Sequence, residues 1–404
     1  MQSLTGNGVA FQNRLEVEWD GRKREWLKVF SRPDMLMKDV GELNNGKATN
    51  YMDNKKWKIP LALFIFTFGF SCTDLSSLNN HSHTYKGDCV ATGAGTTGKT
   101  WSGNYAYVLL VKPALVIIEN VKAAMKGKNF EQLKQDMTAA GYKVAALILN
   151  SATCGLPQDR DRAYFVCVRE ELTDDSWEDK FFEVVEDLKR PEPMPLSRFV
   201  LPDSHPYVQA VLAEKQEKQA KMAMKKIKKR PAKAEPANKR KKGMKWVVDH
   251  WRVRRGLGMK PVAGAVPPSI TEVAERNAMC DRERDLLQMV CEAPSTDRKK
   301  MLSVELKHSA PRVVKTGGRR RQHCTSCLLP SSKMMVFPPT SDSTRFLTGL
   351  EALSLQGVPH SFHESTRVLK DSEYMSLAGN AFSGGCWGLA VLAALSTMNL
   401  EDMD

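Results

Sequence analysis

Short apolar runs, separated by polar and glycine-rich stretches, dominate the first half of the chain. The runs at 60–72 (PLALFIFTFGFSC), 114–118 (ALVII), 144–149 and 163–168 (AYFVCV) each have the length of a strand. Runs with little polar alternation are typical of strands that are covered on both faces. Residues 122–140 between them have a helical pattern. Buried strands that alternate with helices predict an α/β fold with a doubly wound, mostly parallel sheet.

The segment before the first run holds shorter elements. Residues 14–19 (RLEVEW) resemble a strand and residues 21–30 (GRKREWLKVF) a helix, and a further short run ends at Asp39 and Val40. We predict a polar stretch through Asn54. After the strand at 60–72 we predict a long loop, from Thr73 to about Trp101, because the segment is rich in Ser, Asn, Gly and Thr.

The pattern changes after Pro191. A proline-rich stretch and a basic tract follow, residues 246–343 are weakly patterned, and helical patterns return at 344–355 and 384–398. We therefore predict a first domain at 1–190, a middle domain at 191–343 with a basic linker at 215–245, and a return to the first domain at 344–404.

Composition narrows the class of protein. The chain has 404 residues and is 42% hydrophobic, too apolar for a wholly disordered protein. Its apolar runs are shorter than the ~18–20 residues of a membrane helix, so we expect no membrane partner. The first residues lack the pattern of a secretory signal. Nine cysteines without a framework spacing indicate free thiols in a reducing compartment.

The net charge of +14 is concentrated in one tract. Between Lys215 and Lys245 there are fourteen Lys and Arg against two Glu. Such tracts are usually disordered and act as nucleic-acid arms or nuclear localisation signals. The clusters KKIKKR and KRKK fit a bipartite signal, so we expect a nuclear protein. A solvated linker without a receptor is the alternative.

Several side chains that could take part in catalysis or binding lie at predicted strand ends, where α/β sheets bind their ligands. Cys72 ends the first apolar strand, Glu119 ends the second, and Glu18 with Trp19 ends the early strand. A cysteine at such a junction is placed as a nucleophile. An acidic residue there can bind ribose hydroxyls, and an aromatic ring can stack on a base. A buried free cysteine is more often inert packing, and a strand-end Glu is more often a surface cap.

A further group precedes the strand at 163–168. Gln158, Arg160 and Arg162 alternate with other residues in GLPQDRDR (155–162). In an extended segment this spacing puts all three side chains on one face.

In their order along the chain, these segments resemble the motifs of the cytosine-5 DNA methyltransferases. GFSCTDLS (69–76) resembles the nucleophile loop G-F-P-C-x-x-[FL]-S, with Ser71 where the motif has Pro. Glu119-Asn120-Val121 matches E-N-V, and GLPQDRDR matches G-x-P-Q-x-R-x-R. RFLT (345–348) with Glu351 and LQG (355–357) resembles R-x-L-T-x-x-E…L-Q-G. Gly379-Asn380-Ala381-Phe382 resembles G-N-[SA]-V. The family's opening glycine motif is shortened or missing, with LTGNG (4–8) as a possible remnant.

The resemblance implies a Rossmann-like catalytic domain with a smaller inserted target-recognition domain. It implies that Cys72 attacks carbon 6 of a flipped-out cytosine in double-stranded DNA, so that carbon 5 can take a methyl group from S-adenosylmethionine. Glu119 would protonate the ring, and Arg162, Arg160 and Gln158 would hold the base and the loop.

The resemblance also implies the cofactor site. Glu18 and Trp19 would contact the adenosine, and Asp39 and Val40 the adenine. Ser71, Asn380 and Phe382 would complete the site. We expect no resident metal, although His323 with the C-x-x-C pair of Cys324 and Cys327 has the residue types of a zinc site.

Three other interpretations remain open. GAGTTGKT (93–100) fits a phosphate loop, which needs a strand before it and a helix after it. The chain could instead methylate tRNA by the same chemistry. It could also be an inactive, methyltransferase-like nucleic-acid-binding protein.

Overall fold

The computed structural model describes residues 11–75, 88–228, 245–259, 277, 279–292, 301–311, 313, 324–337, 344–360 and 367–402. It divides into two compact units. The first comprises 1–193, 356–370 and 381–404, and the second comprises 194–355 and 371–380. The first boundary lies close to the predicted one at 190. Residues 344–355 and 371–380, which the sequence grouped with the catalytic part, are in the second unit.

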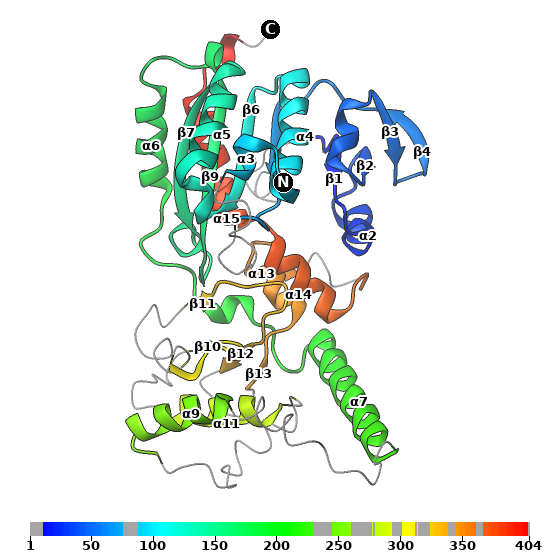
Figure 1. The fold of residues 1–404 in the computed structure, drawn as a ribbon, viewed down its shortest axis with the longest axis vertical. Helices are drawn as coiled ribbons and strands as arrows, with labels where there is room; N and C mark the ends of the chain where they lie inside the picture. The colour runs from blue at the N-terminus through cyan, green and yellow to red at the C-terminus, as the bar shows by residue number, and fades with distance from the viewer. Residues whose placement is uncertain are drawn as a thin grey trace. The chain divides into compact units, whose positions relative to one another are not determined.

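A four-stranded sheet forms the centre of the first unit (Figure 1). Its order is β5 (Ile65–Gly69), β6 (Leu115–Val121), β9 (Asp161–Arg169) and β7 (Tyr142–Asn150). β5 and β6 are parallel, and β9 runs antiparallel to both of its neighbours. β5, β6 and β7 therefore share one direction, so the carboxyl ends of all three lie at one edge of the sheet.

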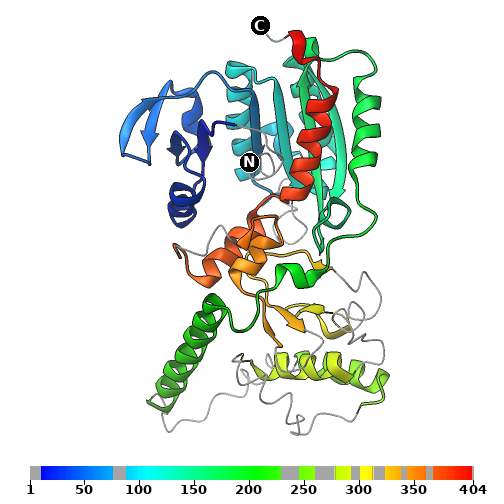
Figure 2. The same cartoon turned by 180° about the vertical axis from the view of Figure 1, so that it is seen from behind.

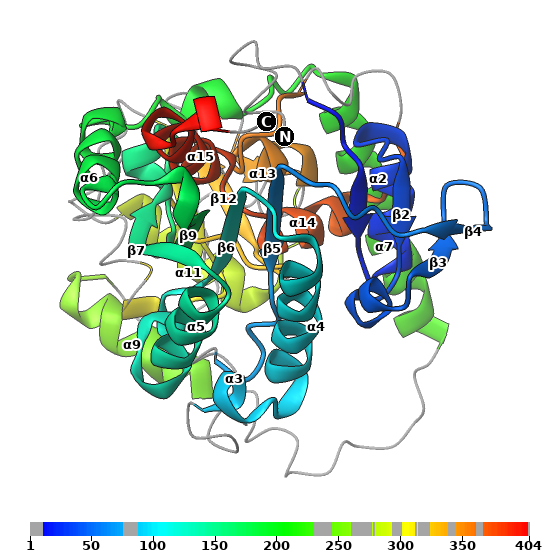
Figure 3. The same cartoon turned by 90° about the horizontal axis from the view of Figure 1, so that it is seen from above.

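Helices cover both faces of this sheet, which confirms the predicted α/β class. Two of the three strand pairings described in the sheet are antiparallel, so the prediction of a mostly parallel sheet is wrong here. Figure 3 shows α4 (Gly95–Val111) and α5 (Gly127–Ala139) on one face. The other face carries α6 (Trp177–Leu188) and α15 (Gly384–Thr397). Figure 2 shows α15, in red, in front of the sheet and α6, in green, beside it. Alternate residues of β6 build the two cores: Val116 and Ile118 pack towards α4 and α5, and the residues between them towards α6 and α15.

The first strand differs from its prediction. The apolar run at 60–72 forms a strand only at Ile65–Gly69, and most of that strand is half-buried. Within the described residues β5 is an edge strand of its sheet, so no described strand pairs with one of its sides. The residues before it form an approach segment in which Leu61 is 58% exposed. Apolar composition alone did not distinguish this segment from the strand.

The loop predicted at 73–101 is wrong in its second half. A short helix, α3 (Cys89–Thr92), is followed by α4 from Gly95 onwards. Glycines and β-branched residues give the start of α4 a low helix propensity. Packing outweighs that propensity, because Trp101 and Val108 of α4 are buried against the sheet.

The amino-terminal elements follow their prediction. β1 (Leu15–Val17) and β2 (Met35–Met37) pair in parallel, and α2 (Gly21–Phe30) connects them. The side chain of Asp20 caps α2 by accepting from two backbone N–H groups. The polar stretch that ends near Asn54 instead contains β3 (Lys47–Asn50), which forms a hairpin with β4 (Lys55–Lys58) directly after the stretch.

The second unit is built around an antiparallel sheet and helices. β10 (Leu302–Glu305), β12 (Met334–Phe337) and β13 (Arg345–Phe346) pair in that order. The helices with described bounds in this unit are α7 (Pro206–Lys228), α9 (Lys245–Gly256), α11 (Asp281–Glu292), α13 (Gly349–Ser354) and α14 (Asp371–Asn380). Short elements of the chain are η1 (Val40–Asn44), η3 (Lys122–Met125), η4 (Ser151–Cys154), η5 (Glu170–Leu172), η6 (Leu196–Phe199), η9 (Leu400–Asp402), β8 (Gln158–Asp159) and β11 (Thr325–Ser326).

The basic tract is helical in its first part. Residues 215–228, predicted to belong to a disordered linker, continue α7, whereas 229–244 lie outside the described residues. Lys and Ala are good helix formers, and this part of the tract contains no proline.

The motif R-x-L-T-x-x-E has a structural role in the second unit. Arg345 and Glu351 form a buried ion pair of 2.7 Å. Thr348 caps α13 and forms a capping box with Glu351. A Glu351 carboxylate oxygen also accepts from the backbone N–H of Leu201 at 2.8 Å. The pair therefore joins the start of α13 to the segment before α7.

One stretch, Asp371–Thr397, has the length and apolarity of a membrane span by composition alone, and 61% of its window is buried. It consists of two helices, α14 and α15, with residues 381–383 between them. Since α15 belongs to the core of the sheet, the signal is of the kind that buried helices give.

Glu351→Ala should destabilise the second unit by about 3 kcal/mol, because it removes the buried partner of Arg345 and leaves the partly exposed Asp203, 2.8 Å from Nε, to compensate the charge. Urea unfolding measures the change. Glu217→Ala is the matched control, since it removes an exposed pair with Lys221 worth about 0.3–0.5 kcal/mol. Equal effects of the two substitutions would contradict the role given to the buried pair.

Candidate active site

Three predicted site residues meet at the carboxyl ends of β5 and β6. In the register of these strands Gly69 lies opposite Glu119, and Cys72 follows three residues after Gly69. On the other side of β6, Arg162 of β9 lies opposite Val121. The strand pairing therefore brings Cys72, Glu119 and Arg162 together, although they are far apart in the sequence.

Glu119 is a buried carboxyl group with a close cationic partner. Its Oε1 lies 3.1 Å from Nε of Arg162. Burial raises the pKa of Glu119, and the positive charges of Arg162 and then Arg160 lower it in part. The net shift is upwards, so the carboxyl group retains its proton to a higher pH than an exposed glutamate does.

Cys72 is exposed as a residue, but protein surrounds part of its thiol. This partial burial raises the pKa of Cys72, and the Glu119 carboxylate raises it further. Arg162 and Arg160 lower the pKa of the thiol because a cation stabilises the thiolate. The site thus couples the protonation of the thiol to that of the carboxyl group.

Gln158 and Arg160 are fully enclosed, whereas Asp159 and Asp161 between and after them are exposed. This is the alternation that an extended segment produces. Nη2 of Arg160 donates to the carbonyl of Ala381 at 2.8 Å. Oε1 of Gln158 accepts from Nε2 of Gln356 at 3.3 Å. These two side chains therefore tie their loop to the carboxyl-terminal part of the unit.

Asn120 is a site residue that the sequence interpretation named only within its motif. Its Nδ2 donates to the carbonyl of Phe70 at 2.9 Å, and its Oδ1 accepts from the N–H of Val121 at 2.8 Å. The buried amide thus holds the backbone just before Cys72. In the sequence, its position next to Glu119 was the feature that could have identified Asn120 as a site residue.

The predicted adenosine contacts lie at the carboxyl ends of β1 and β2. Glu18 follows β1, and its N–H donates to Met37 of β2. The ring of Trp19 is 66% exposed, with Nζ of Lys38 4.6 Å from its centre. Asp39 follows β2 and caps η1, which begins with Val40, by accepting from the N–H of Gly41.

The predicted residues Phe382 and Asn380 have different positions. The ring of Phe382 packs against Gly69, where an added Cβ would come within 2.9 Å of the ring. The glycine is therefore required for this close approach. Asn380 is the last residue of α14 and belongs to the second unit, whereas Phe382 belongs to the first.

The phosphate-loop interpretation is wrong. The segment before Gly93 is the helix α3, where that motif requires a strand. A Cβ at Gly98 would come within 2.3 Å of the carbonyl oxygen of Cys89. The glycine thus permits the tight turn from α3 into α4. Thr97 and Thr100 of the same motif contact the loop that carries Cys72 and the residues around it.

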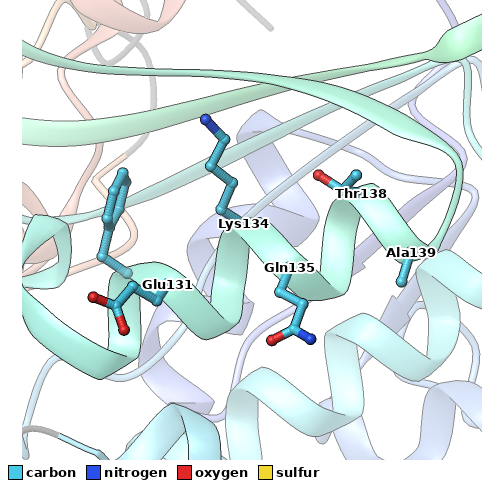
Figure 4. A pocket seen from close by; sticks show the side chains of 6 residues that line it. Glu131, Lys134, Gln135, Thr138 and Ala139 are labelled. Carbon is cyan, nitrogen blue, oxygen red and sulfur yellow. The ribbon is translucent and has the colours of Figure 1, made fainter.

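Among the described residues, no group of three or more His, Cys, Asp or Glu has the arrangement of a metal site. His323 of the candidate cluster lies outside those residues. Figure 4 shows a shallow depression on the outer surface of α5, which is lined by that helix alone. Its lining residues include none of the predicted site residues.

Comparisons with known proteins agree on one family. A family model described as C-5 cytosine-specific DNA methylase matches residues 9–384. The chain is 25% identical over 410 residues to the DNA (cytosine-5-)-methyltransferase DMT5 of Cryptococcus neoformans, covering 96% of this chain and 16% of that protein. It is 33% identical over 100 residues to the Type II methyltransferase M.HhaI of Haemophilus parahaemolyticus, covering 23% of this chain and 27% of that protein. The matches thus span well under two thirds of these relatives.

Among solved structures, a putative DNA modification methyltransferase from an E. coli prophage is similar, with a TM-score of 0.49 and 15% identity. That match covers 98% of this chain and 94% of the other.

Glu119→Gln should lower the pKa of Cys72, since it removes a negative charge and frees Arg162 to stabilise the thiolate. The rate of Cys72 alkylation by iodoacetamide, followed by mass spectrometry across pH, should rise at lower pH than in the parent protein. Glu131→Gln, on the exposed surface of α5, is the control and should leave the profile unchanged. An unshifted profile in Glu119→Gln would show that the two groups are not coupled.

Proposed function

The chain belongs to the C-5 cytosine-specific DNA methylase family, and from this premise we propose that it transfers a methyl group from S-adenosylmethionine to carbon 5 of cytosine in double-stranded DNA. The observation that carries the proposal is the convergence of Cys72, Glu119 and Arg162 on one edge of the sheet. A thiol, a carboxyl group of raised pKa and a cation are the groups that this chemistry needs.

The residues at the ends of β1 and β2 fit the adenosine half of the cofactor. A carboxylate at a strand end can accept from ribose hydroxyls, and Glu18 has this position. The exposed ring of Trp19 offers a stacking face, and Asp39 and Val40 would adjoin the adenine. Phe382 and Ser71 would line the side near Gly69. S-adenosylmethionine supplies the methyl group when bound.

Cys72 and Glu119 would activate the base together. The Cys72 thiolate forms a bond to carbon 6 of cytosine, and the ring nitrogen at position 3 takes the proton from Glu119. The electron pair of the former C5–C6 double bond then makes carbon 5 nucleophilic. After methylation a base removes the proton on carbon 5, the bond between sulfur and carbon 6 breaks to restore the thiolate, and the ring nitrogen returns its proton to the Glu119 carboxylate.

The electrostatics of the site suit these roles. The raised pKa of Glu119 favours the protonated carboxyl group, and this acid form is the one that can give a proton to the cytosine ring. Arg162 would hold this carboxyl group in place and contact the base, while Arg160 and Gln158 fix the loop beneath it. The rate should fall as pH rises through the pKa of Glu119, because the acid form is lost. It should fall at low pH because the thiolate is lost.

The second unit and the basic tract would serve DNA recognition. We propose that the second unit includes the inserted target-recognition domain. The base must leave the duplex to reach Cys72, so the DNA backbone needs support from cations. The lysines of α7 and the tract after it provide such cations. The same tract is proposed as a nuclear address, and a fluorescent fusion that stays cytoplasmic would contradict that role.

Cys72→Ala should abolish methyl transfer, because no other group in the cluster can form the bond to carbon 6. Transfer of labelled methyl from S-adenosylmethionine to duplex DNA and to tRNA measures the effect. Cys280→Ala, at another exposed cysteine, is the control and should retain activity. Cys72-dependent transfer to tRNA alone would favour the RNA enzyme. No transfer to either substrate would favour the inactive nucleic-acid-binding protein.

Replacing Lys225, Lys226 and Lys228 of α7 with Gln should weaken duplex DNA binding and flatten its salt dependence. Each lost phosphate contact should reduce the slope of log K against log salt by about 0.9. The control replaces Lys126, Lys128 and Lys134, which are exposed in and before α5, and so removes the same charge. Equal slopes in the two variants would show that α7 is not a DNA contact.

A further inference from the structure

Ser71 precedes the nucleophilic cysteine at a position where the family motif has proline. Proline would restrict the backbone there and would have no N–H group. Serine keeps that N–H, and a partly buried donor needs an acceptor. The N–H of Ser71 donates to Oγ1 of Thr100 in α4 at 2.9 Å. The acceptor thus comes from a helix that packs on the sheet and not from the loop itself.

The hydroxyl of Thr100 is itself fixed. It donates to the carbonyl oxygens of Thr96 at 2.9 Å and Thr97 at 3.0 Å, one turn earlier in α4. Because its proton points into the helix, a lone pair is left for the N–H of Ser71. A residue at 100 without a hydroxyl would leave this N–H without the acceptor.

A second anchor ties the loop to the start of the same helix. A carboxylate oxygen of Asp74 accepts from the N–H of Thr97 at 2.9 Å, and the N–H of Asp74 donates to Oγ1 of Thr97 at 3.2 Å. A carboxylate is favoured at a helix N-terminus, where backbone N–H groups are unpaired. Residues on both sides of Cys72 are therefore held by α4.

Hydrogen bonds within the loop also fix the backbone on both sides of Cys72. Oγ of Ser71 lies 2.9 Å from Oγ1 of Thr73, and the N–H of Thr73 donates to the same Ser71 oxygen at 3.3 Å. From the other side Asn120 donates to the carbonyl of Phe70. The sulfur of Cys72 thus lies on a short turn whose two ends are fixed.

We propose that Thr100 is a positioning residue for Cys72, and that its hydrogen bond to Ser71 replaces the restriction that proline supplies in the family motif. The inference rests on the proposed function, because it assigns the fixed thiol to the attack on cytosine. Thr100 touches neither base nor cofactor in this role and acts only through the loop.

Four variants of the full-length chain test the proposal: Thr100→Val, Thr100→Ser, Ser71→Pro, and Ser71→Pro combined with Thr100→Val. Valine has the shape of threonine without the hydroxyl, and serine retains the hydroxyl. In the Ser71→Pro background there is no N–H to satisfy, so the loss of the Thr100 hydroxyl should not matter. Thr92→Val is the control, because the Thr92 hydroxyl donates to the carbonyl oxygen of Asp88, just before the same short helix.

The first readout is the single-turnover rate of methyl transfer with saturating duplex DNA and S-adenosylmethionine. Thr100→Val should lose about tenfold or more, as expected when a donor loses its acceptor. Thr100→Ser and Thr92→Val should stay close to the parent. Adding Thr100→Val to Ser71→Pro should change the rate less than twofold. An equal loss in both backgrounds would overturn the proposal, because the hydroxyl would then act independently of the Ser71 N–H.

The second readout does not depend on enzymatic activity. The pH profile of Cys72 alkylation by iodoacetamide should move to lower pH in Thr100→Val, because a released thiol leaves the partly buried position that raises its pKa. It should not move when Thr100→Val is added to Ser71→Pro. If these alkylation profiles are found but the parent protein transfers no methyl group, the proposed function is refuted and the positioning role of Thr100 stands. An unchanged profile in Thr100→Val beside normal transfer would refute the anchor alone.

Discussion

The position of β6 between two partners is the constraint on which the site depends. β6 is buried on both faces and pairs with β5 on one edge and β9 on the other. This pairing fixes the register that places Gly69 beside Glu119 and Arg162 near the same strand end. A shift of one residue would turn Glu119 towards the opposite face and part it from Arg162. The chemistry of the site is therefore a consequence of strand register.

The sequence predicted the central elements well and the junctions poorly. β6, β7, β9 and α15 have strong apolar patterns, and their burial in the two cores explains why these patterns were informative. α4 was missed because its first turns have low helix propensity and are stabilised by tertiary packing. The limits of β5 were missed because an exposed approach segment is as apolar as the strand itself.

The motif residues fall into two physical groups. Cys72, Glu119 and Arg162 have charges and protons that influence one another, and their roles follow from that coupling. Other motif residues, such as Arg345 and Glu351, are buried partners that stabilise the backbone. The sequence alone could not separate the two groups, because the residue type of a motif arginine does not show whether its role is catalytic or structural. Their burial and partners separate them.

The most direct measurement of the central claim is a covalent trap. Duplex DNA that contains 5-fluorocytosine has no proton on carbon 5 to remove, so an adduct formed at carbon 6 cannot break down after methylation. The account predicts that the chain, with S-adenosylmethionine, becomes linked to such DNA, and that mass spectrometry locates the bond on the peptide containing Cys72. Linkage through another residue, or active transfer without any adduct, would contradict the account.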